Sequence, residues 1–446
     1  MLAILLALYS KNILLSLFGG VLLGLFILND FALFTTLSAT YALFLELLSE
    51  SWILKTLAFA ILVGSVMELL QRSGAIEGFV EYMSHKTSLV HSGRSALLLS
   101  YIIGVVIFIE SSITSLIAGA VGRPLCDKYG VSHAKLAFVC DSTSAPISSL
   151  IVLNGWGALL LGLIATQIEQ GSIQGEGITI LLNAVMYNFY AMSALVVTFL
   201  AIWFDINIGP MKQAKAVPQT QQNRAKSANM TPLFMLLPII VMIFSVFFFL
   251  YMSGDGNILK GSGSSAIFYT MLTTLAFMFV LYIPTKRIST KMYTVAAFKG
   301  AKKLFPIALI LLFAFAIGKV TNELKTGEYL ASLAGENLSV IFLAALIFLL
   351  SSIISFSTGT SWGTFSIMIP IAAPLAATLG GDVTLAIGAV ISGGVFGDHC
   401  SPISDTTIIS SLASECDVIE HVQTQLPYAL LSGAVALIFF MVVSIF

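Results

Sequence analysis

Residues 394–407 read Gly394-Val-Phe-Gly-Asp398-His-Cys-Ser-Pro402-Ile-Ser-Asp405-Thr-Thr, and this stretch decides what kind of fold the chain adopts. It lies inside a largely apolar region, 355–411, that is also rich in Gly, Ser, Thr and Pro. An unbroken membrane-spanning helix does not carry two carboxylates, a histidine and a proline so close together. Non-helical backbone inside a membrane persists only where protein or a water-filled cavity covers it. The stretch therefore predicts a broken helix beside a binding site.

The composition around this stretch is that of a membrane protein. Of the 446 residues, 58% are hydrophobic and 10% are charged, whereas soluble domains are roughly 25% charged. A helix needs about 20 mostly apolar residues to cross a bilayer, and stretches of that kind recur along the whole chain. The net charge of −1 offers no basic surface for nucleic acid. A soluble enzyme, a disulfide-rich secreted domain and a disordered chain are excluded.

The predicted fold is an all-α polytopic membrane protein with about 10–12 transmembrane segments, two inverted repeats, re-entrant hairpins and broken helices. The clearest spanning stretches are Lys11–Leu28, Trp52–Leu70, Ala96–Ile109, Leu150–Ile164, Ile178–Trp203, Pro232–Met252, Ile267–Ile283, Phe305–Val320, Val340–Ile354 and Tyr428–Phe446.

Loop charges predict the orientation. The loops 204–231 and 285–303 are rich in Lys and Arg, and the positive-inside rule places them in the cytoplasm. The loops 166–177 and 321–337 are acidic, and each lies one helix away from a basic loop, so both are expected outside.

A weak internal repeat organises the chain. Gly64-Ser-Val-Met-Glu68 precedes Asp141-Ser-Thr-Ser-Ala-Pro, and Gly318-Lys-Val-Thr-Asn-Glu323 precedes Asp398-His-Cys-Ser-Pro at nearly the same spacing. The loop charges indicate that the two copies cross in opposite directions, which is the pattern of an inverted repeat. We therefore divide the chain into N-terminal helices (1–50), a first repeat (51–204), a cytoplasmic linker with connecting helices (205–304) and a second repeat (305–446).

Acids in the interrupted regions are the candidate ion-binding groups. Asp141 and Asp398 recur in both halves, and Glu110 and Asp405 accompany them. Carboxylates at membrane depth are costly and mark functional sites; the alternative is that neighbouring hydroxyls hold them to fix a helix break. We expect Na⁺ at Asp141 and Asp398, with hydroxyls and freed carbonyls as further ligands. The remaining candidates for cation or proton binding are Ser142, Thr143, Ser357, Thr358, Thr360, Ser361, Ser401 and His399. His399 is equally compatible with a neutral structural role.

The motif at 394–407 resembles that of the NhaC-type sodium/proton antiporter family. Residues 357–364 (Ser-Thr-Gly-Thr-Ser-Trp-Gly-Thr) and 141–147 (Asp-Ser-Thr-Ser-Ala-Pro-Ile) resemble further signatures of that family. Gly327-Glu-Tyr and Tyr187-Asn-Phe-Tyr extend the resemblance over most of the chain. The resemblance implies a secondary transporter with inverted repeats, whose hairpin tips and helix breaks form cation sites at the membrane midplane.

Two transport functions remain open. The resemblance favours exchange of Na⁺ for H⁺ by alternating access, with both ions competing for one carboxylate. His399 and Ile403 replace the Lys and Leu of the commonest antiporter motif, and the family also includes sodium-coupled carriers of amino acids and organic acids. Such a carrier needs a larger cavity, for which Asn154 and Trp156 are candidate donors and Trp362 a candidate apolar wall. Packing is the alternative role for Trp362.

Other functions fit less well. A membrane enzyme using Asp398, His399 and Ser401 is the rival class, but the repeat duplicates the aspartate without the histidine. No nucleotide-binding motif is present, so an ion gradient must drive transport. We expect no enzyme activity and no cofactor, with Na⁺ and H⁺ as transported ions. The expected partners are the lipid bilayer and small cations, without nucleic acid; the assembly considered is a homodimer. The expected location is the cytoplasmic (inner) membrane of a prokaryote, as a multi-pass protein.

Overall fold

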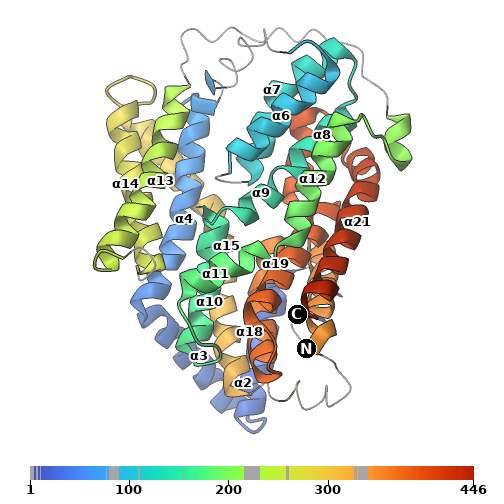
Figure 1. The fold of residues 1–446 in the computed structure, drawn as a ribbon. Coiled ribbons are helices and arrows are strands. Elements are labelled where there is room, and N and C mark those ends of the chain that lie inside the picture. The colour runs from blue at the N-terminus through green and yellow to red at the C-terminus, as the bar shows by residue number, and fades with distance from the viewer. Residues whose placement is uncertain are drawn as a thin grey trace.

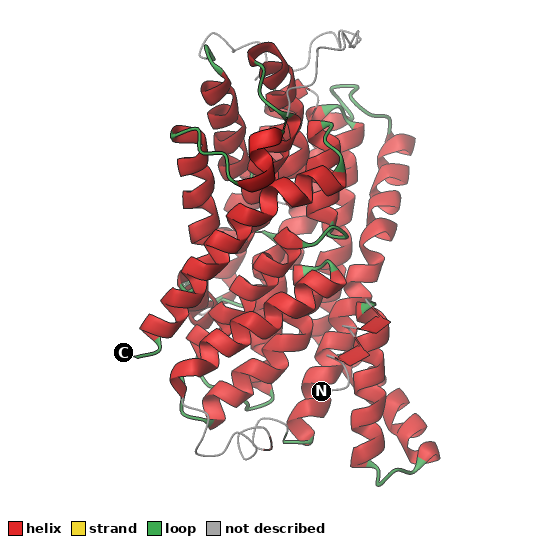
Figure 2. Ribbon diagram, turned by 90° about the vertical axis from the view of Figure 1, so that its right-hand side faces the viewer, coloured by secondary structure: helices red, strands yellow, loops and turns green. Residues whose placement is uncertain are grey.

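A computed structural model describes residues 5–6, 9–10, 12–76, 78–79, 90–108, 111–152, 154–214, 232–257, 261–325, 329 and 340–445. Throughout these residues the regular structure is helical (Figures 1 and 2). The helices of the first half are α2 (Ile13–Leu28), α3 (Leu33–Ser49), α4 (Ser51–Arg72), α6 (Gly93–Val106), α7 (Ser111–Tyr129), α8 (His133–Ser142), α9 (Ala145–Leu150), α10 (Gly155–Glu169), α11 (Gly177–Met186) and α12 (Phe189–Trp203).

The second half begins with two helices, α13 (Leu233–Ser253) and α14 (Gly263–Tyr282), that lie together at one edge of the molecule (Figure 1). The remaining helices are α15 (Thr290–Glu323), α17 (Leu343–Thr358), α18 (Ser361–Thr378), α19 (Val383–Cys400), α20 (Asp405–Ser414) and α21 (Val418–Val443). Short 3₁₀ turns occupy Gly209–Gln213 and Val340–Phe342.

The described residues contain eight helices that are long and apolar enough to cross a membrane, or up to ten if each of two bent pairs forms one span. This confirms the all-helical, multi-span fold class. The bent pairs are α8–α9 with α10, and α11 with α12, each bent by 41°. Neither bend was predicted: Leu150–Ile164 and Ile178–Trp203 were each expected to be one continuous span, whereas the first bend lies between Leu150 and Gly155 and the second between Met186 and Phe189.

Helices α4 and α15 form a close antiparallel pair. The rings of Trp52 and Phe315 lie 5.2 Å apart, while Gly64 meets Gly300 so closely that a Cβ on Gly64 would lie 2.2 Å from the Gly300 carbonyl oxygen. The start of α4 therefore lies beside the later part of α15, and the later part of α4 lies beside the earlier part of α15, so the two helices are antiparallel. Since α15 also contains Gly318, the helices of Gly64 and Gly318 run in opposite directions, as the repeat predicted.

Two helical hairpins point into the protein, one in each half. The second hairpin, α17–α18, turns at Gly359, whose φ of 66° suits a residue without a Cβ. A Cβ on Gly359 would lie 2.8 Å from the carbonyl oxygen of Ile403. In the first hairpin, α6–α7, a Cβ on Gly104 would lie 2.0 Å from the Thr143 hydroxyl oxygen. Each hairpin thus packs against the helix break of its own half.

The helix breaks themselves separate α8 from α9 and α19 from α20. Pro146 stands in the first turn of α9, and Pro402 lies between α19 and α20. Proline lacks an N–H and clashes with the carbonyl four residues earlier, so it prevents each helix from continuing. Asp141 lies in the last turn of α8, which ends at Ser142, and Asp398 lies in the last turn of α19, which ends at Cys400.

Several predicted element boundaries were wrong. Leu150–Ile164 is not one helix, because α9 ends at Leu150 and Asn154 caps a new helix, α10. The basic segment 285–303, predicted as a loop, is largely the first part of α15. The last helix begins at Val418, ten residues before the predicted Tyr428, because its first three turns are too polar to be detected by hydropathy.

Candidate functional site

A cavity of about 370 Å³ lies between the tip of the α17–α18 hairpin and the break after α19. Its polar wall includes Thr360 and Ser361 from the hairpin, Asp398 from α19 and Asp405 from α20. Its apolar walls come from α4, α10, α15 and α18. The residues that complete the lining are Val63, Met67, Ser111, Ser112, Gly155, Trp156, Leu304, Ile307, Ile310, Gly359, Trp362 and Ile403.

Asp398 and Asp405 bring two carboxylates to this cavity. Asp398 is 1% exposed, and its Oδ1 has no hydrogen-bond partner. Asp405 is exposed to the cavity and stands in the first turn of α20, where the N-terminal helix dipole favours a negative charge. Because no Lys, Arg or His is among the described lining residues, the charge of this pair must be balanced by a bound cation or by protons.

The hydroxyl residues around Asp398 mostly stabilise the backbone. Thr360 caps α18 by accepting from the Gly363 N–H at 3.3 Å, and Ser361 donates to the Gly394 carbonyl at 3.1 Å. Ser401 donates to the Phe356 carbonyl at 2.8 Å. Ser361 uses its hydroxyl proton in its bond to Gly394 and keeps its oxygen lone pairs, whereas Thr360 uses one lone pair for the Gly363 N–H and keeps the other. Both residues line the cavity, so each has a lone pair available to a cation.

The other predicted hydroxyl ligands lie farther from the cavity. Thr358 donates to the Ile354 carbonyl at 2.8 Å within its own helix, and Thr143 donates to the Val139 carbonyl at 2.8 Å. Ser357 is half-buried near the end of α17. None of these three lines the cavity in the described part of the chain. Glu110 lies outside the described residues.

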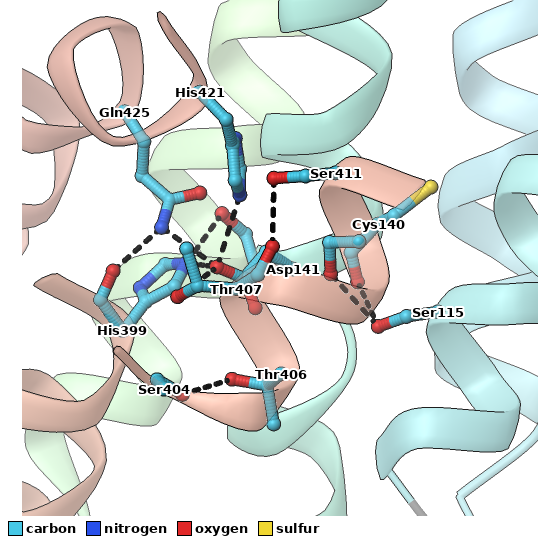
Figure 3. A network of polar contacts seen from close by, with 12 residues as sticks. Ser115, Cys140, Asp141, His399, Ser404, Thr406, Thr407, Ser411, His421 and Gln425 are labelled. Carbon is cyan, nitrogen blue, oxygen red and sulfur yellow. Dashed lines mark hydrogen bonds and ion pairs between the residues drawn. The ribbon is translucent and has the colours of Figure 1, made fainter. Parts of the chain in front are cut away.

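Asp141 sits in a separate, fully enclosed cluster (Figure 3). Its Oδ2 accepts hydrogen bonds from the Gln425 amide at 2.8 Å and from the Thr407 hydroxyl at 3.3 Å, and the His421 Nε2 lies 3.3 Å away. The second imidazole, His399, has its Nε2 at 3.8 Å from the same oxygen. Two imidazoles and an amide therefore surround one carboxylate oxygen.

His399 is held from both ring nitrogens. Its Nδ1 lies 2.6 Å from the Tyr190 hydroxyl and its Nε2 lies 3.2 Å from the Ser142 hydroxyl. The Gln425 amide, which donates to Asp141, also donates to the His399 carbonyl at 2.6 Å. Since both hydroxyls rotate and act as donor or acceptor, these bonds accommodate a neutral or a protonated imidazole.

Three polar atoms of the enclosed cluster remain unpaired: Asp141 Oδ1, His421 Nδ1 and Gln425 Oε1. Buried polar groups in native proteins are nearly always hydrogen-bonded, so unpaired atoms at one place indicate a site for a proton, an ion or a water. No three His, Cys, Asp or Glu side chains in the described ranges are arranged to hold a metal ion together. A cation here would need hydroxyl, amide or carbonyl oxygens as well.

The residues proposed for an organic solute divide into two groups. Trp362 and Trp156 both line the cavity, with their ring centroids 6.1 Å apart and their planes near perpendicular at 83°. Asn154 does not line it. Its amide donates to the Phe108 and Ser148 carbonyls at 2.8 Å each, and its oxygen caps α10. Both amide hydrogens are in use, so Asn154 ties the first hairpin to the helix break and has no donor left for a solute.

Sequence reasoning missed part of the enclosed cluster. His421, Gln425, Thr407 and Tyr190 were not predicted as site residues, although Tyr190 belongs to a quoted motif. His421 and Gln425 are four residues apart at the start of α21, so they share one helix face. Two polar side chains in that register, ahead of an apolar run, were the available signal.

The chain is similar in sequence to known membrane transporters. A model of the Na⁺/H⁺ antiporter family matches residues 154–445. An uncharacterized protein of Haemophilus influenzae is 32% identical over 96% of this chain and 86% of its own length. The malate-2H⁺/Na⁺-lactate antiporter of Bacillus subtilis is 39% identical over 24% of this chain and 22% of its own length.

The fold has a relative among solved structures. The YdaH transporter of Alcanivorax borkumensis superposes with a TM-score of 0.64, covering 92% of this chain and 88% of that chain, at 13% sequence identity. A likeness at that identity establishes a shared fold. Together with the family match over most of the chain, it identifies a secondary transporter and not an enzyme: the chain belongs to the Na⁺/H⁺ antiporter family.

Proposed function

We propose that this protein is a secondary active antiporter that exchanges Na⁺ for H⁺ by alternating access. The observation that carries the proposal is the pair of carboxylates, Asp398 and Asp405, on one cavity whose described lining contains no basic side chain. A cavity of this kind attracts cations and repels anions. Membership of the family indicates that the protein is a secondary transporter, and the acidic cavity indicates that the transported ion is a cation.

Sodium and protons are interchangeable neutralisers of the same carboxylate. An ionised Asp398 in a protein interior needs a compensating positive charge, and either Na⁺ or H⁺ supplies it. Burial favours the protonated form, whereas nearby oxygens and cations favour the ionised form. Alternating access to the two sides then exchanges one ion for the other without a covalent step.

The proposed Na⁺ ligands at the cavity are the carboxylates of Asp398 and Asp405 and the hydroxyl oxygens of Thr360 and Ser361. Sodium is a hard cation that prefers such oxygens, and broken helices add carbonyls. We further propose Asp141 as a second ion or proton site, because its Oδ1 is unpaired. Its Oδ2 is already surrounded by donors, so Asp141 has less capacity for a cation than Asp398.

The second candidate function is sodium-coupled transport of an organic solute. The specific observation in its favour is the size of the cavity, about 370 Å³, since one water needs roughly 10–15 Å³ of such space. A bare ion does not require so much room, and two tryptophans do not ligate sodium. The name of the B. subtilis relative likewise describes movement of organic molecules together with Na⁺ and H⁺.

The repeat organisation is proposed on the same geometry. Residues 51–204 contain a long helix, an inward hairpin and a broken helix with Asp141 in its last turn. Residues 305–446 contain most of the long helix α15, an inward hairpin and a broken helix with Asp398 in its last turn. Residues 1–50 add helices, and 205–304 connect the halves. We place the protein in the cytoplasmic membrane. Arg72, Lys299 and Lys303 gather where α4 meets α15, and the positive-inside rule assigns such basic helix ends to the cytoplasm. A homodimer remains part of the proposal.

The test is ion flux in proteoliposomes that contain only the purified protein. A pH gradient, acidic inside, should drive ²²Na⁺ uptake without any organic solute, and imposed Na⁺ gradients should acidify or alkalinise the lumen accordingly. Flux that appears only when an amino acid or organic acid is added would replace the exchanger with the solute carrier. Absence of both fluxes, with folded protein in the vesicles, would contradict both functions.

A further inference from the structure

The cavity has more room than a dehydrated ion needs. Its volume is about 370 Å³, and a single water occupies roughly 10–15 Å³ on the same measure. One wall is aliphatic: Leu304, Ile307 and Ile310 recur every three residues along α15 and all face the cavity. A short hydrocarbon chain is the kind of group that such a wall accommodates, because burying apolar surface is favourable.

Two tryptophans form another part of the lining. Trp362, in the first turn of α18, stands edge-on to Trp156, and Gly155 lies beside the Trp362 ring. Tryptophan is the aromatic side chain that attracts cations most strongly across its face. Neither indole is needed to hold Na⁺, whose ligands are oxygens.

The charge of the lining residues determines which charge a bound solute can carry. Asp398 and Asp405 are the ionisable groups among the described lining residues, so a carboxylate solute would meet two like charges without a basic partner. Like-charge contact and unpaired buried charge are effective means of rejecting the wrong ligand. An ammonium group, in contrast, has three donors that match the carboxylate oxygens of this wall.

We propose that this cavity binds an organic cation, a primary ammonium group on a short aliphatic chain, with the ammonium at Asp398 and Asp405 and the chain between Trp362 and the α15 wall. The proposal rests on the proposed function, in which the same cavity is the transport site. The organic cation and Na⁺ compete for the same carboxylates, so binding of one excludes the other and the protein can exchange them. Organic anions do not bind in this cavity.

Displacement of bound ²²Na⁺ from the purified protein in detergent tests this directly. n-Butylammonium is the probe; butyrate and butan-1-ol have the same chain with a negative charge and with none. We expect butylammonium to displace ²²Na⁺ where butyrate and butanol at equal concentration do not. Displacement by butyrate, or ²²Na⁺ binding that butylammonium leaves unchanged, would overturn the proposal while the sodium function stands.

Matched variants locate the effect. For each variant, the affinity for butylammonium is compared with the affinity of the same variant for Na⁺. Trp362→Leu should lower the relative affinity for butylammonium about fivefold. Trp203→Leu, at an exposed tryptophan on α12, should leave it unchanged. Asp405→Asn should lower the affinity for butylammonium about tenfold, and Asp405→Glu should restore part of that loss. Equal effects of the two tryptophan variants would contradict the proposed contact.

The proposal stays testable if ²²Na⁺ does not bind, which would itself contradict sodium exchange. A variant that keeps only Trp156 and Trp362 of the four tryptophans reports cavity occupancy by fluorescence. Butylammonium should change that fluorescence saturably, and Asp405→Asn should shift the midpoint. A fluorescence response to butyrate, or none to butylammonium, would overturn the organic-cation site.

Discussion

Asp398 and His399 are consecutive residues in the last turn of α19, and they contribute to two different sites. Asp398 lines the open cavity, while His399 contacts Tyr190 and Ser142 beside the enclosed Asp141. The end of one helix therefore joins the cavity to the enclosed cluster. Any movement of α19 at its break changes the surroundings of both aspartates together, which is what coupled binding of two ions requires.

The Gln425 amide should control the pH dependence of transport. It donates to both Asp141 Oδ2 and the His399 carbonyl, and donors to a carboxylate favour its charged form. Gln425→Leu removes both donors, so the balance between ions and protons at the enclosed cluster, and with it the pH profile of transport, should change. The measurement is the pH profile of ²²Na⁺ flux.

Gln423→Leu is the matched control for Gln425→Leu, because Gln423 lies on the same helix but is exposed. It should leave the pH profile in place. An unchanged profile in Gln425→Leu, with normal folding, would show that the enclosed cluster is structural.

The contact between Gly64 and Gly300 should set the packing of α4 on α15. A Cβ at Gly64 would lie 2.2 Å from the Gly300 carbonyl oxygen, so Gly64→Ala should force the helices apart and destabilise the protein by about 1–3 kcal/mol. Gly177→Ala is a suitable control, since its nearest neighbour is a flexible Leu161 methyl at 3.3 Å. Thermal unfolding in detergent measures both, and equal melting temperatures would refute the close packing.

Cysteine labelling should confirm the orientation. In a Cys416→Ser background, Cys126, Cys140 and Cys400 are buried, so an introduced cysteine reports its own side. Lys286→Cys should react with impermeant maleimide only in inside-out vesicles, and Asp255→Cys only in intact cells, because α14 separates the two positions. Labelling of both from the same side would contradict the topology.

Asp405→Asn should impair sodium transport less than Asp398→Asn does. Both residues line the cavity, but Asp405 is exposed whereas Asp398 is 1% exposed, so loss of the Asp398 charge leaves the more deeply buried site without its carboxylate. In the first half, Ser149 stands where the repeat would place Asp405. The measure is the Na⁺ concentration dependence of flux: Asp405→Asn should raise KM and keep residual turnover. Complete loss in Asp405→Asn alone would reverse the assigned order.

The sequence predicted what local chemistry determines. Proline and acids in apolar context marked both helix breaks. Trp362 lines the cavity, and its expected role as the wall of a solute site stays a prediction. What could not be predicted depends on which helices meet: His421 and Gln425 reach Asp141 only because α21 packs on α8. Asn154 was predicted as a site residue because it is polar and close to Asp141 in the sequence, but in the structure it caps α10.

Asp398→Asn in proteoliposomes tests the central claim, that Asp398 carries the exchanged cation. The amide keeps the shape of the side chain and removes its charge, so we predict folded protein without pH-driven ²²Na⁺ flux and without saturable ²²Na⁺ binding. Asp255→Asn, at an exposed loop aspartate whose positive φ of 49° asparagine tolerates, should behave as the unmodified protein. Unimpaired sodium flux and binding in Asp398→Asn would contradict the account.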